Sequence, residues 1–510
     1  MTHFTTLAEM VSHQVTEAVA FTAPSCLPLT YGALSTLTQN TMRTLNVLGI
    51  GRGDRVAIVL PNCPEMACVF VAVASCCTAA PLNTGYRTEE FEFYLGDLKA
   101  RALIVAHGSD GPALAAAAKL GIMVLTLQPL PLGGTGSFVL SSAAVGSPVA
   151  TARAGLAQAD DVALILHTSG TTSRPKVVPL SQRNACSSAR HISTTLRLSP
   201  ADRGLHIMPM FHIHGLIAGL LAPLAAGSQI VCTPGFNALR FFGWIQECKP
   251  TWYTAVPTMH QTILARAAGN KEVIAANPLR FIRSSSSSMP PQVIAELERV
   301  FGAPLIESYG MTEAAHQMTS NPLPPARRIP GSVGIAAGPE VAVMDDAGVL
   351  LPSGVIGEVV IRGDNVTPGY ENNALANAQA FVNGWFRTGD QGVLDADGYL
   401  TLTGRLKEII NRGGEKISPR EVDEVLMDHP AVAQVVTFAM RHDKLGEEVA
   451  AAVVLREGQQ LTERELRDFA ATRLADFKVP KKVLFLSEIP KGATGKLQRI
   501  GLAAVLGLGN

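Results

Sequence analysis

The sequence lacks an excess of charge of either sign, since 42 Lys and Arg residues balance 42 Asp and Glu residues over 510 positions. Charged residues make up only 16% of the chain and aromatic residues 5%, whereas hydrophobic residues reach 47%. A balanced chain has no net field that recruits nucleic acid or an anionic membrane. Its apolar share excludes a disordered protein. We therefore expect a soluble globular protein of two or three domains that binds anions only through local groups, with no nucleic-acid partner.

Targeting and cross-linking signals are also missing. The first ten residues have no basic start or apolar run of a secretory signal, and the final Gly-Leu-Gly-Asn510 is no peroxisomal tripeptide. The most membrane-like run, Met66–Ala80, is shorter than the roughly 20 residues that span a bilayer, and we predict a buried helix there. None of the eight cysteines forms a Cys-x-x-Cys pair. These features predict a cytoplasmic protein with reduced cysteines and no integral membrane association.

One loop concentrates hydrogen-bond donors. Ala163–His167 is typical of a buried strand, and the stretch Thr-Ser-Gly-Thr-Thr-Ser-Arg-Pro-Lys follows it at 168–176. Small and hydroxylated residues let backbone N–H groups converge on an anion, and a lysine at the far end adds positive charge. The alternative is an ordinary polar surface loop. The pattern predicts a phosphate cradle made by Thr168, Ser169, Gly170, Thr171, Thr172 and Lys176.

Two other loop chemistries are excluded by spacing. A Walker A loop counted from Gly170 has Pro175 where its second glycine belongs and Val177 where its metal-binding hydroxyl belongs. A hydrolase nucleophile elbow needs glycine two residues on either side of its serine. Ser169 has His167 and Thr171 at those positions. The loop is therefore neither a P-loop nor a serine-hydrolase site.

The loop resembles the signature of the acyl-adenylate-forming superfamily, which includes acyl-CoA synthetases, luciferases and the adenylation domains of peptide synthetases. The resemblance spans nearly the whole chain, with one departure, since Val177 stands where the family usually has glycine. Four further motifs follow in the expected order: Tyr309-Gly-Met-Thr-Glu313, Trp385-Phe-Arg-Thr-Gly-Asp390, Gly404-Arg-Leu-Lys-Glu408 and Pro490-Lys-Gly-Ala-Thr-Gly-Lys496.

An α/β fold is expected from the pattern and from the resemblance. We predict a large N-terminal AMP-binding domain at 1–403, built from α/β sheet subdomains and a distorted β-barrel in a helix-free region from about Asn321 to Thr403. A small mobile α+β domain at 404–510 follows, with its hinge near Lys407. Expected helices include 34–48, 181–196, 419–427 and 462–474; expected strands include 56–60, 103–106, 123–127, 251–256, 280–283 and 304–308, with 128–158 as a long connection.

The resemblance assigns roles to the motif residues. It implies that ATP and CoA are co-substrates and that Glu313 holds Mg²⁺ while Thr312 contacts the α-phosphate. Asp390 accepts from the ribose hydroxyls and Arg405 supports the nucleotide, whereas Lys496 bridges the α-phosphate and the substrate carboxylate. The remaining residues are Ser308, Tyr309 and Gly310 for ATP or AMP, Gly413 and Gly414 for CoA, and Lys407 as the hinge.

The acid pocket is predicted to be small and polar. His212 and His214 would share one face of a strand, and a structural role is open beside substrate contact, although no third ligand supports a metal site. Several stretches also resemble oxalate–CoA ligases, among them Arg280–Ser284 and Met311–His316. We expect oxalyl-CoA formation from oxalate, ATP and CoA; malonate, a 4-coumarate-like acid or delivery of the adenylate to a carrier protein are the alternatives. The segments expected to line the pocket bring His212, His214, Ser285 to Ser288 and His316. The acid-binding residues predicted among them are His212, His214, Ser287, Ser288 and His316.

Overall fold

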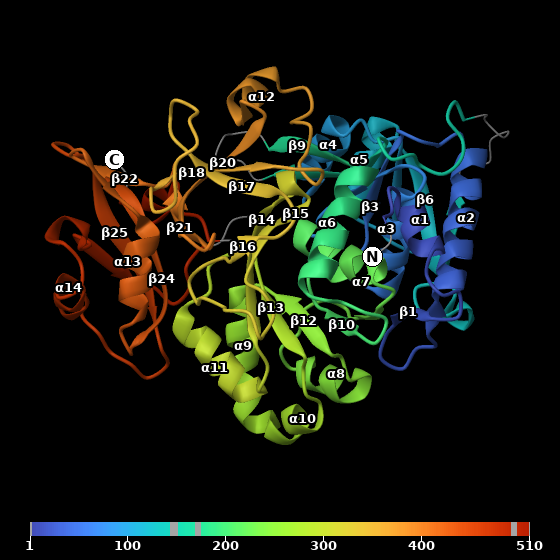
Figure 1. Ribbon diagram of the computed structural model, residues 1–510. Coiled ribbons are helices and arrows are strands. Elements are labelled where there is room, and N and C mark those ends of the chain that lie inside the picture. Colours follow the sequence, from blue (N-terminus) through green and yellow to red (C-terminus); the bar gives the residue numbers. More distant parts are fainter. Residues whose placement is uncertain (1–2, 143–150, 169–174, 491–496, 509–510) are drawn as a thin grey trace. The chain divides into compact units, whose positions relative to one another are not determined.

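The computed structural model describes residues 3–142, 151–168, 175–490 and 497–508 (Figure 1). The chain divides into two compact units. The larger unit holds Met1–Thr168, Pro175–Val341 and Ile361–Ala380, and the smaller unit holds Ala342–Val360 and Phe381–Asn510. Both units mix helices with sheets, so the predicted α/β class is confirmed. The domain boundary at 403–404 stays a prediction.

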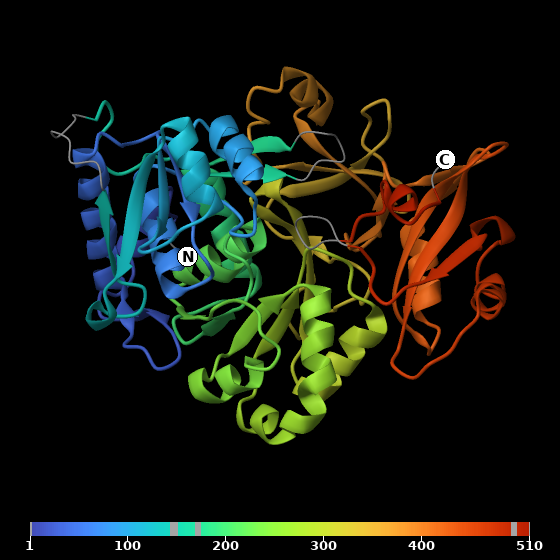
Figure 2. The same cartoon turned by 180° about the vertical axis from the view of Figure 1, so that it is seen from behind.

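The larger unit contains a seven-stranded sheet with the order β7-β6-β5-β3-β4-β8-β9. Its central strands are parallel, whereas β7 and β9 close the two edges antiparallel to their neighbours. Apolar residues of α4 and α5, including Phe91 and Leu95, pack on the sheet and cover one face (Figure 2). The strands are β3 Arg55–Val59, β4 Thr78–Pro81, β5 Ala102–Ala106, β6 Met123–Pro129, β7 Phe138–Ser142, β8 Val162–Thr168 and β9 Lys176–Ser181; the helices are α1 Leu7–Ser12, α2 Tyr31–Val47, α3 Pro64–Ala74, α4 Thr88–Asp97 and α5 Pro112–Leu120.

Two predictions for this sheet were wrong. The run Met66–Ala80 is not one helix, because α3 ends at Ala74 and the chain re-enters the sheet as β4, where the Thr78 hydroxyl donates to the Val162 carbonyl at 2.7 Å. Helix and strand here are both buried, so apolar composition alone could not separate them. The expected connection 128–158 likewise contains β7, which pairs with β6.

The larger unit also contains a nine-stranded sheet with the order β16-β15-β14-β13-β12-β10-β11-β1-β2. Helices α8 to α11 cover one of its faces (Figure 2), and α6 contacts strands of both sheets. The strands are β1 Val19–Thr22, β2 Leu29–Thr30, β10 Arg203–His206, β11 Gln229–Cys232, β12 Trp252–Ala255, β13 Phe281–Ser284, β14 Leu305–Met311, β15 His316–Ser320 and β16 Ile335–Ala336; the helices are α6 Gln182–Thr195, α7 Ala222–Ala225, α8 Phe241–Cys248, α9 Pro257–Ala267, α10 Lys271–Ala276 and α11 Pro291–Phe301.

A five-stranded sheet runs largely through the smaller unit, where the distorted barrel is expected. Its order is β17-β18-β20-β19, and β21 also pairs with β20, so the strand pairs of the described residues leave the sheet open. The prediction of a helix-free region was wrong, because α12 Ala374–Ala380 lies within it, in the larger unit. Asn373 accepts the Ala376 N–H at 3.0 Å and so caps this helix. The strands are β17 Glu340–Met344, β18 Gly357–Arg362, β19 Phe381–Val382, β20 Trp385–Leu394 and β21 Leu400–Arg405.

The C-terminal part of the smaller unit is a second five-stranded sheet, β23-β22-β25-β24 with β26 on β25. Two helices pack on it as predicted, because Val422, Leu426 and Leu466 enter its core. Their starts are fixed by Ser418 and Thr462, whose hydroxyls accept backbone N–H groups of the first turn. The elements are β22 Ile410–Arg412, β23 Glu415–Ile417, β24 Val432–His442, β25 Gly446–Leu455, β26 Lys482–Phe485, α13 Pro419–Met427, α14 Glu463–Ala471 and α15 Leu502–Val505.

All eight cysteines are free thiols in this structure. In the part of the chain that the structure describes, no helix is both long and apolar enough to cross a membrane.

Candidate active site

The candidate site is built at the carboxyl ends of neighbouring parallel strands in the nine-stranded sheet. Strands β12 and β13 pair in parallel register, and so do β13 and β14, so their carboxyl ends reach the same edge of the sheet. Ligands bind at this edge in α/β folds. Thr254, Ser284 to Ser286 and Ser308 therefore lie near one another at that edge. The Ser285 hydroxyl donates to the Ser308 carbonyl at 2.9 Å across the two strands.

His214 reaches this edge from a π-helix, η2 His214–Leu221, which it begins. The prediction that His212 and His214 share a strand face was wrong, because β10 ends at His206 and Pro209, which cannot donate a ladder hydrogen bond, follows shortly. The two histidines are instead placed differently. His214 is buried, whereas His212 is half-buried, with its ring 4.6 Å from the Phe211 ring.

His214 stacks on His316, with ring centroids 4.9 Å apart and ring planes 22° from parallel. His316 begins β15 directly after Ala315, and both residues have positive φ, 99° and 46°. Such backbone values are uncommon outside glycine and are often found at functional sites. The tight passage also requires Gly310 opposite, because a Cβ there would lie 1.5 Å from the His316 carbonyl oxygen. The predicted pair is thus brought together by an unusual backbone turn.

The His214 ring is held by two hydroxyl groups. Its Nε2 lies 2.7 Å from the Thr254 hydroxyl, and its Nδ1 lies 3.0 Å from the Ser286 hydroxyl. Ser286 has a positive φ of 75°. The two serines that the sequence favours, Ser287 and Ser288, are exposed. The position of Ser286 depends on a backbone conformation that a run of five serines does not reveal.

Arg283 was also missed. Arg283 is the second-last residue of β13 and is fully buried. Its Nη1 donates to Thr254 Oγ1 at 3.3 Å and to His214 Nε2 at 3.4 Å. Its Nη2 donates to the Gln317 amide oxygen at 3.2 Å. Burial lowers the pKa of Arg283 to about 9, so it stays charged at neutral pH. The signal in the sequence was a charged residue directly after two apolar residues, Phe281 and Ile282, of an expected buried strand.

Glu313 lies in the short 3₁₀ turn Thr312–Ala314 (η4). Its carboxylate is buried and accepts the Tyr370 hydroxyl at 2.9 Å. The backbone is held as well, since the Thr367 N–H donates to the Glu313 carbonyl at 2.7 Å and the Asn365 amide donates to the Ala314 carbonyl at 2.8 Å. A carboxylate whose side chain and backbone are both held by hydrogen bonds, as in Glu313, is suited to binding a hard cation.

Lys176 lies beside Tyr370, the residue that donates to the Glu313 carboxylate. Its Nζ is 4.2 Å from the centre of the Tyr370 ring, a cation–π contact. Val177 of β9 stands where the family usually has glycine. It pairs with His167 of β8 and packs on the apolar cluster of the seven-stranded sheet. Since it is not among the residues with positive φ, the side chain fits without backbone strain. The departure from the family pattern is therefore accommodated by a regular strand.

In the smaller unit, Asp390 and Arg405 face each other across β20 and β21. Arg405 Nε donates to Asp390 Oδ1 at 3.0 Å, and the Asp390 carboxylate is nearly buried while the guanidinium is half exposed. Glu358 holds the backbone of β20 just before Asp390 by accepting the Gly389 N–H at 2.8 Å. The two motifs that the sequence analysis links to the nucleotide thus meet in one ion pair.

The hinge and CoA candidates also lie in the smaller unit. Lys407 is exposed in the turn between β21 and β22, next to Leu406, whose N–H donates to the Gly389 carbonyl at 3.0 Å. Gly413 and Gly414 form the turn between β22 and β23, with positive φ of 59° and 102°. These assignments stay predictions.

Several predicted residues are placed only in part. Thr168 ends β8 opposite Lys176, Ser308 is buried in β14, and Tyr309 follows it. Ser169, Gly170, Thr171, Thr172 and Lys496 lie outside the described residues.

The sequence is similar to known enzymes over most of its length. Residues 9–371 match the AMP-binding enzyme family, and residues 421–496 match the AMP-binding enzyme C-terminal domain. The chain is 46% identical to oxalate–CoA ligase of Arabidopsis thaliana, over 97% of this chain and 96% of that protein. It is 42% identical to oxalate–CoA ligase of Saccharomyces cerevisiae, over 88% and 86%.

Among solved structures, ATP-bound MatB from Rhodopseudomonas palustris superposes with a TM-score of 0.88 at 29% identity, over 99% of each chain. The family match covers more than half of the chain. The chain belongs to the AMP-binding enzyme family.

Proposed function

We propose that this protein is an ATP-dependent acid–CoA ligase that joins oxalate to CoA through an oxalyl-AMP intermediate. The observation that carries the proposal is the buried, stacked pair His214 and His316 with the hydroxyls of Thr254 and Ser286 around it. The family match and the two relatives named oxalate–CoA ligases support it.

The pocket chemistry favours a small acid with two polar ends. A buried donor left unpaired by an alkyl chain costs about 1–3 kcal/mol, so a fatty acid would lose binding at each such group. Oxalate has a carboxylate at each end and no methylene, so one end can react while the other accepts hydrogen bonds from the histidine and serine groups. Malonate shares the second carboxylate but is longer by one carbon, which makes it the nearest competitor.

The reaction has two steps. A carboxylate oxygen of the acid attacks the α-phosphorus of ATP, the bond to the β-phosphate oxygen breaks, and diphosphate leaves. The CoA sulfur then loses its proton, attacks the acyl carbon, and AMP leaves as the thioester forms. Bringing two anions to about 4 Å in the first step costs on the order of 4 kcal/mol at an effective dielectric constant near 20, so the site must supply positive charge. We assign that role to Lys176 and Lys496, with Thr312 on the α-phosphate.

Glu313 fits a magnesium site. Mg²⁺ in nucleotide sites usually takes one or two carboxylates and completes its shell with phosphate oxygens and water. Glu313 offers one buried carboxylate held by Tyr370, and no cluster of three or more His, Cys, Asp or Glu that could hold a metal occurs within the described ranges. When bound with ATP, the ion would neutralise charge on the phosphates.

The remaining motif residues complete the proposal. Thr168 to Thr172 hold the diphosphate end, Ser308 to Gly310 hold the adenine side, and Asp390 with Arg405 hold the ribose. A turn of the domain 404–510 about Lys407 then presents Gly413 and Gly414 to CoA in place of Lys496.

A substrate panel tests the function. We would compare oxalate, malonate, acetate, 4-coumarate and a medium-chain fatty acid by kcat/KM for AMP release that requires both the acid and CoA. Oxalate should exceed each of the others by at least about tenfold, the discrimination that one or two lost hydrogen bonds provide. Preference for another acid would refute the oxalate assignment, and AMP release independent of CoA would indicate transfer to another acceptor.

Two variants show whether the pocket is assigned correctly. His316→Ala should raise the KM for oxalate about tenfold or more while changing the KM for ATP less than threefold, because only the acid meets the stacked ring. His260→Gln is the matched control, since His260 is a buried histidine whose nitrogens bond to Tyr253 and to the Arg283 carbonyl. Similar losses for both substrates in His316→Ala would place His316 outside the acid site.

A further inference from the structure

A guanidinium is buried in the nine-stranded sheet without an acidic partner. Arg283 has none of its surface exposed, and none of the ion pairs among the described residues includes it. Burial alone lowers its pKa, with no contribution from a neighbouring charge. Buried charges in proteins are normally paired, because an isolated one is costly. This arginine is therefore an exception that needs an explanation.

The neutral groups around Arg283 satisfy it poorly. Its three hydrogen bonds, to Thr254, His214 and Gln317, are 3.2–3.4 Å long, whereas N–H···O bonds are usually about 2.9–3.0 Å. Its Nε has no partner. Gln317 is fixed by other contacts, since its amide nitrogen donates to Thr195 at 3.2 Å and to the Ala337 carbonyl at 3.1 Å. The positive charge thus lies among weak, neutral acceptors.

The hydrogen bonds run outward from this charge in one direction. Arginine can only donate, so Thr254 Oγ1 and His214 Nε2 are acceptors toward it. Nε2 of His214 accepts again from the Thr254 hydroxyl, which leaves the ring proton on Nδ1, where it is donated to Ser286 Oγ. Ser286 is half-buried at the start of the exposed serines and has its own hydroxyl proton to donate onward. A chain of donors that begins at a cation favours an anion at its end.

We infer that Arg283 determines specificity: through His214 and Ser286, its buried charge selects an acid that carries a second carboxylate. This inference rests on the proposed function and deepens it. The distal carboxylate of a diacid compensates the guanidinium, whereas a neutral group at that end leaves it uncompensated. Arg283 is a positioning residue, because it acts on the acid through other side chains.

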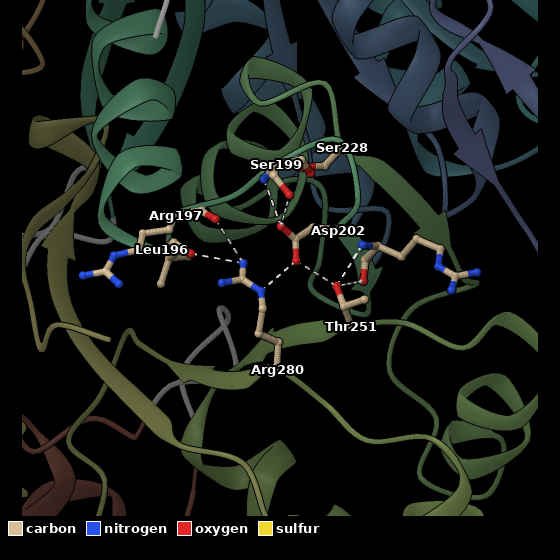
Figure 3. A network of polar contacts seen from close by, with 8 residues as sticks. Leu196, Arg197, Ser199, Asp202, Ser228, Thr251 and Arg280 are labelled. Carbon is tan, nitrogen blue, oxygen red and sulfur yellow. Dashed lines mark hydrogen bonds and ion pairs between the residues drawn. The ribbon is translucent and has the colours of Figure 1, made fainter. Parts of the chain in front are cut away.

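Arg280 provides a matched comparison three residues earlier. Its Nε donates to the buried Asp202 carboxylate at 2.8 Å, and its Nη2 donates to the Leu196 carbonyl at 3.1 Å (Figure 3). Asp202 also accepts the N–H and hydroxyl of Ser199 and the hydroxyl of Thr251. Arg280 has its acidic partner, Asp202, within the fold, and it lies at the end of β13 that is opposite to the histidines. We expect Arg280 to have no role in substrate choice.

The test compares oxalate with oxamate, which has the same shape but a neutral amide in place of the second carboxylate. Arg283→Met keeps the length and apolar stem but removes the charge. It should lower kcat/KM for oxalate about 100-fold, in the range for a desolvated charge interaction, and change the Ki of oxamate as a competitive inhibitor less than threefold. Arg283→Lys should retain at least part of the preference for oxalate. Arg280→Met should leave the ratio of the two ligands unchanged.

Equal losses for oxalate and oxamate in Arg283→Met would show that Arg283 only supports the fold, and the inference would be wrong. If the methionine variant does not fold, Arg283→Gln and Arg283→Lys give the same comparison, with the glutamine variant losing the preference and the lysine variant keeping it. ATP binding by each variant, measured by calorimetry, confirms an intact nucleotide site. A wild-type protein inactive on oxalate would refute the proposed function itself, which is a different outcome.

Discussion

At the scale of single residues, the best-defined contact in the nucleotide part of the site is the hydrogen bond from Tyr370 to Glu313. The tyrosine hydroxyl has a raised pKa, chiefly because of burial and then because of the nearby carboxylate, so it donates at any ordinary pH. It therefore fixes one oxygen of Glu313 and helps to orient the group proposed to hold Mg²⁺.

We predict that Tyr370→Phe raises the KM for MgATP about three- to tenfold and shifts the Mg²⁺ dependence to higher concentration, because one hydrogen bond to a charged group is lost. The KM for the acid should change less than twofold. Tyr31→Phe is a control of equal chemistry, since its hydroxyl donates to the Ser228 carbonyl at 2.7 Å and should affect stability alone. An unchanged MgATP dependence in Tyr370→Phe would detach this tyrosine from the metal site.

The sequence led to Glu313 and His316 because each stands in or beside a motif, and to His214 because it is paired with His212 two residues earlier. Thr254 and Arg283 were missed, and Ser286 was not chosen from the serine run, for a physical reason. They meet His214 only because β12 and β13 lie side by side and because Ser286 takes a left-handed backbone conformation. Neither strand order nor a single positive φ can be read from residue spacing.

At the scale of elements, patterns with strong periodicity predicted well and buried apolar runs did not. The amphipathic helices α13 and α14 were located within a few residues from their periodicity, and the structure shows that Ser418 and Thr462 cap their starts. The buried run that contains α3 and β4 has no polar face, so no hydrophobic periodicity distinguishes helix from strand in it. The end of the helix at Ser75 was therefore not predicted.

The turn between β21 and β22 carries the prediction about domain rotation. Lys407→Pro should fix φ near −65° and favour one orientation of the C-terminal domain, so one half-reaction should fall at least about tenfold more than the other. Diphosphate release from ATP and acid measures the first step, and thioester formation from supplied acyl-AMP and CoA measures the second. Lys407→Ala is the control and should leave both near the wild-type rate.

Equal rates in Lys407→Pro and the wild type for both half-reactions would exclude residue 407 as the hinge. Equal losses in both steps would indicate damage to the turn, and the hinge would then have to be sought elsewhere between β21 and β22.

At the scale of the whole molecule, buried histidines couple stability to pH. Burial lowers the pKa of His260 to about 4, below the ordinary value of 6.5. A depressed pKa in the folded state means that the stabilising contribution is present above pH 6.5 and is lost as the pH falls toward 4. His191, whose pKa burial also lowers to about 4, adds in the same direction.

We predict that the free energy of unfolding of the wild type falls between pH 7 and pH 5, and that His260→Gln removes about 2 kcal/mol of this fall, since each group contributes at most about 1.4 kcal/mol per pH unit below 6.5. Urea unfolding followed by tryptophan fluorescence reports it, because Trp244 and Trp252 are buried in the larger unit, which also holds His260. His107→Gln, a substitution at an exposed histidine, is the control. A His260→Gln curve parallel to the wild type would contradict the prediction.

The measurement that tests the central claim most directly is a competition for one active site. Wild-type protein would be incubated with oxalate and malonate at equal concentration, Mg²⁺, CoA and a limiting amount of ATP. The thioesters would then be separated and quantified by mass spectrometry. The proposed polar pocket predicts oxalyl-CoA as the main product, with about one AMP released for each thioester formed. Malonyl-CoA as the main product, or AMP without a new thioester, would contradict the assignment of this protein as an oxalate–CoA ligase.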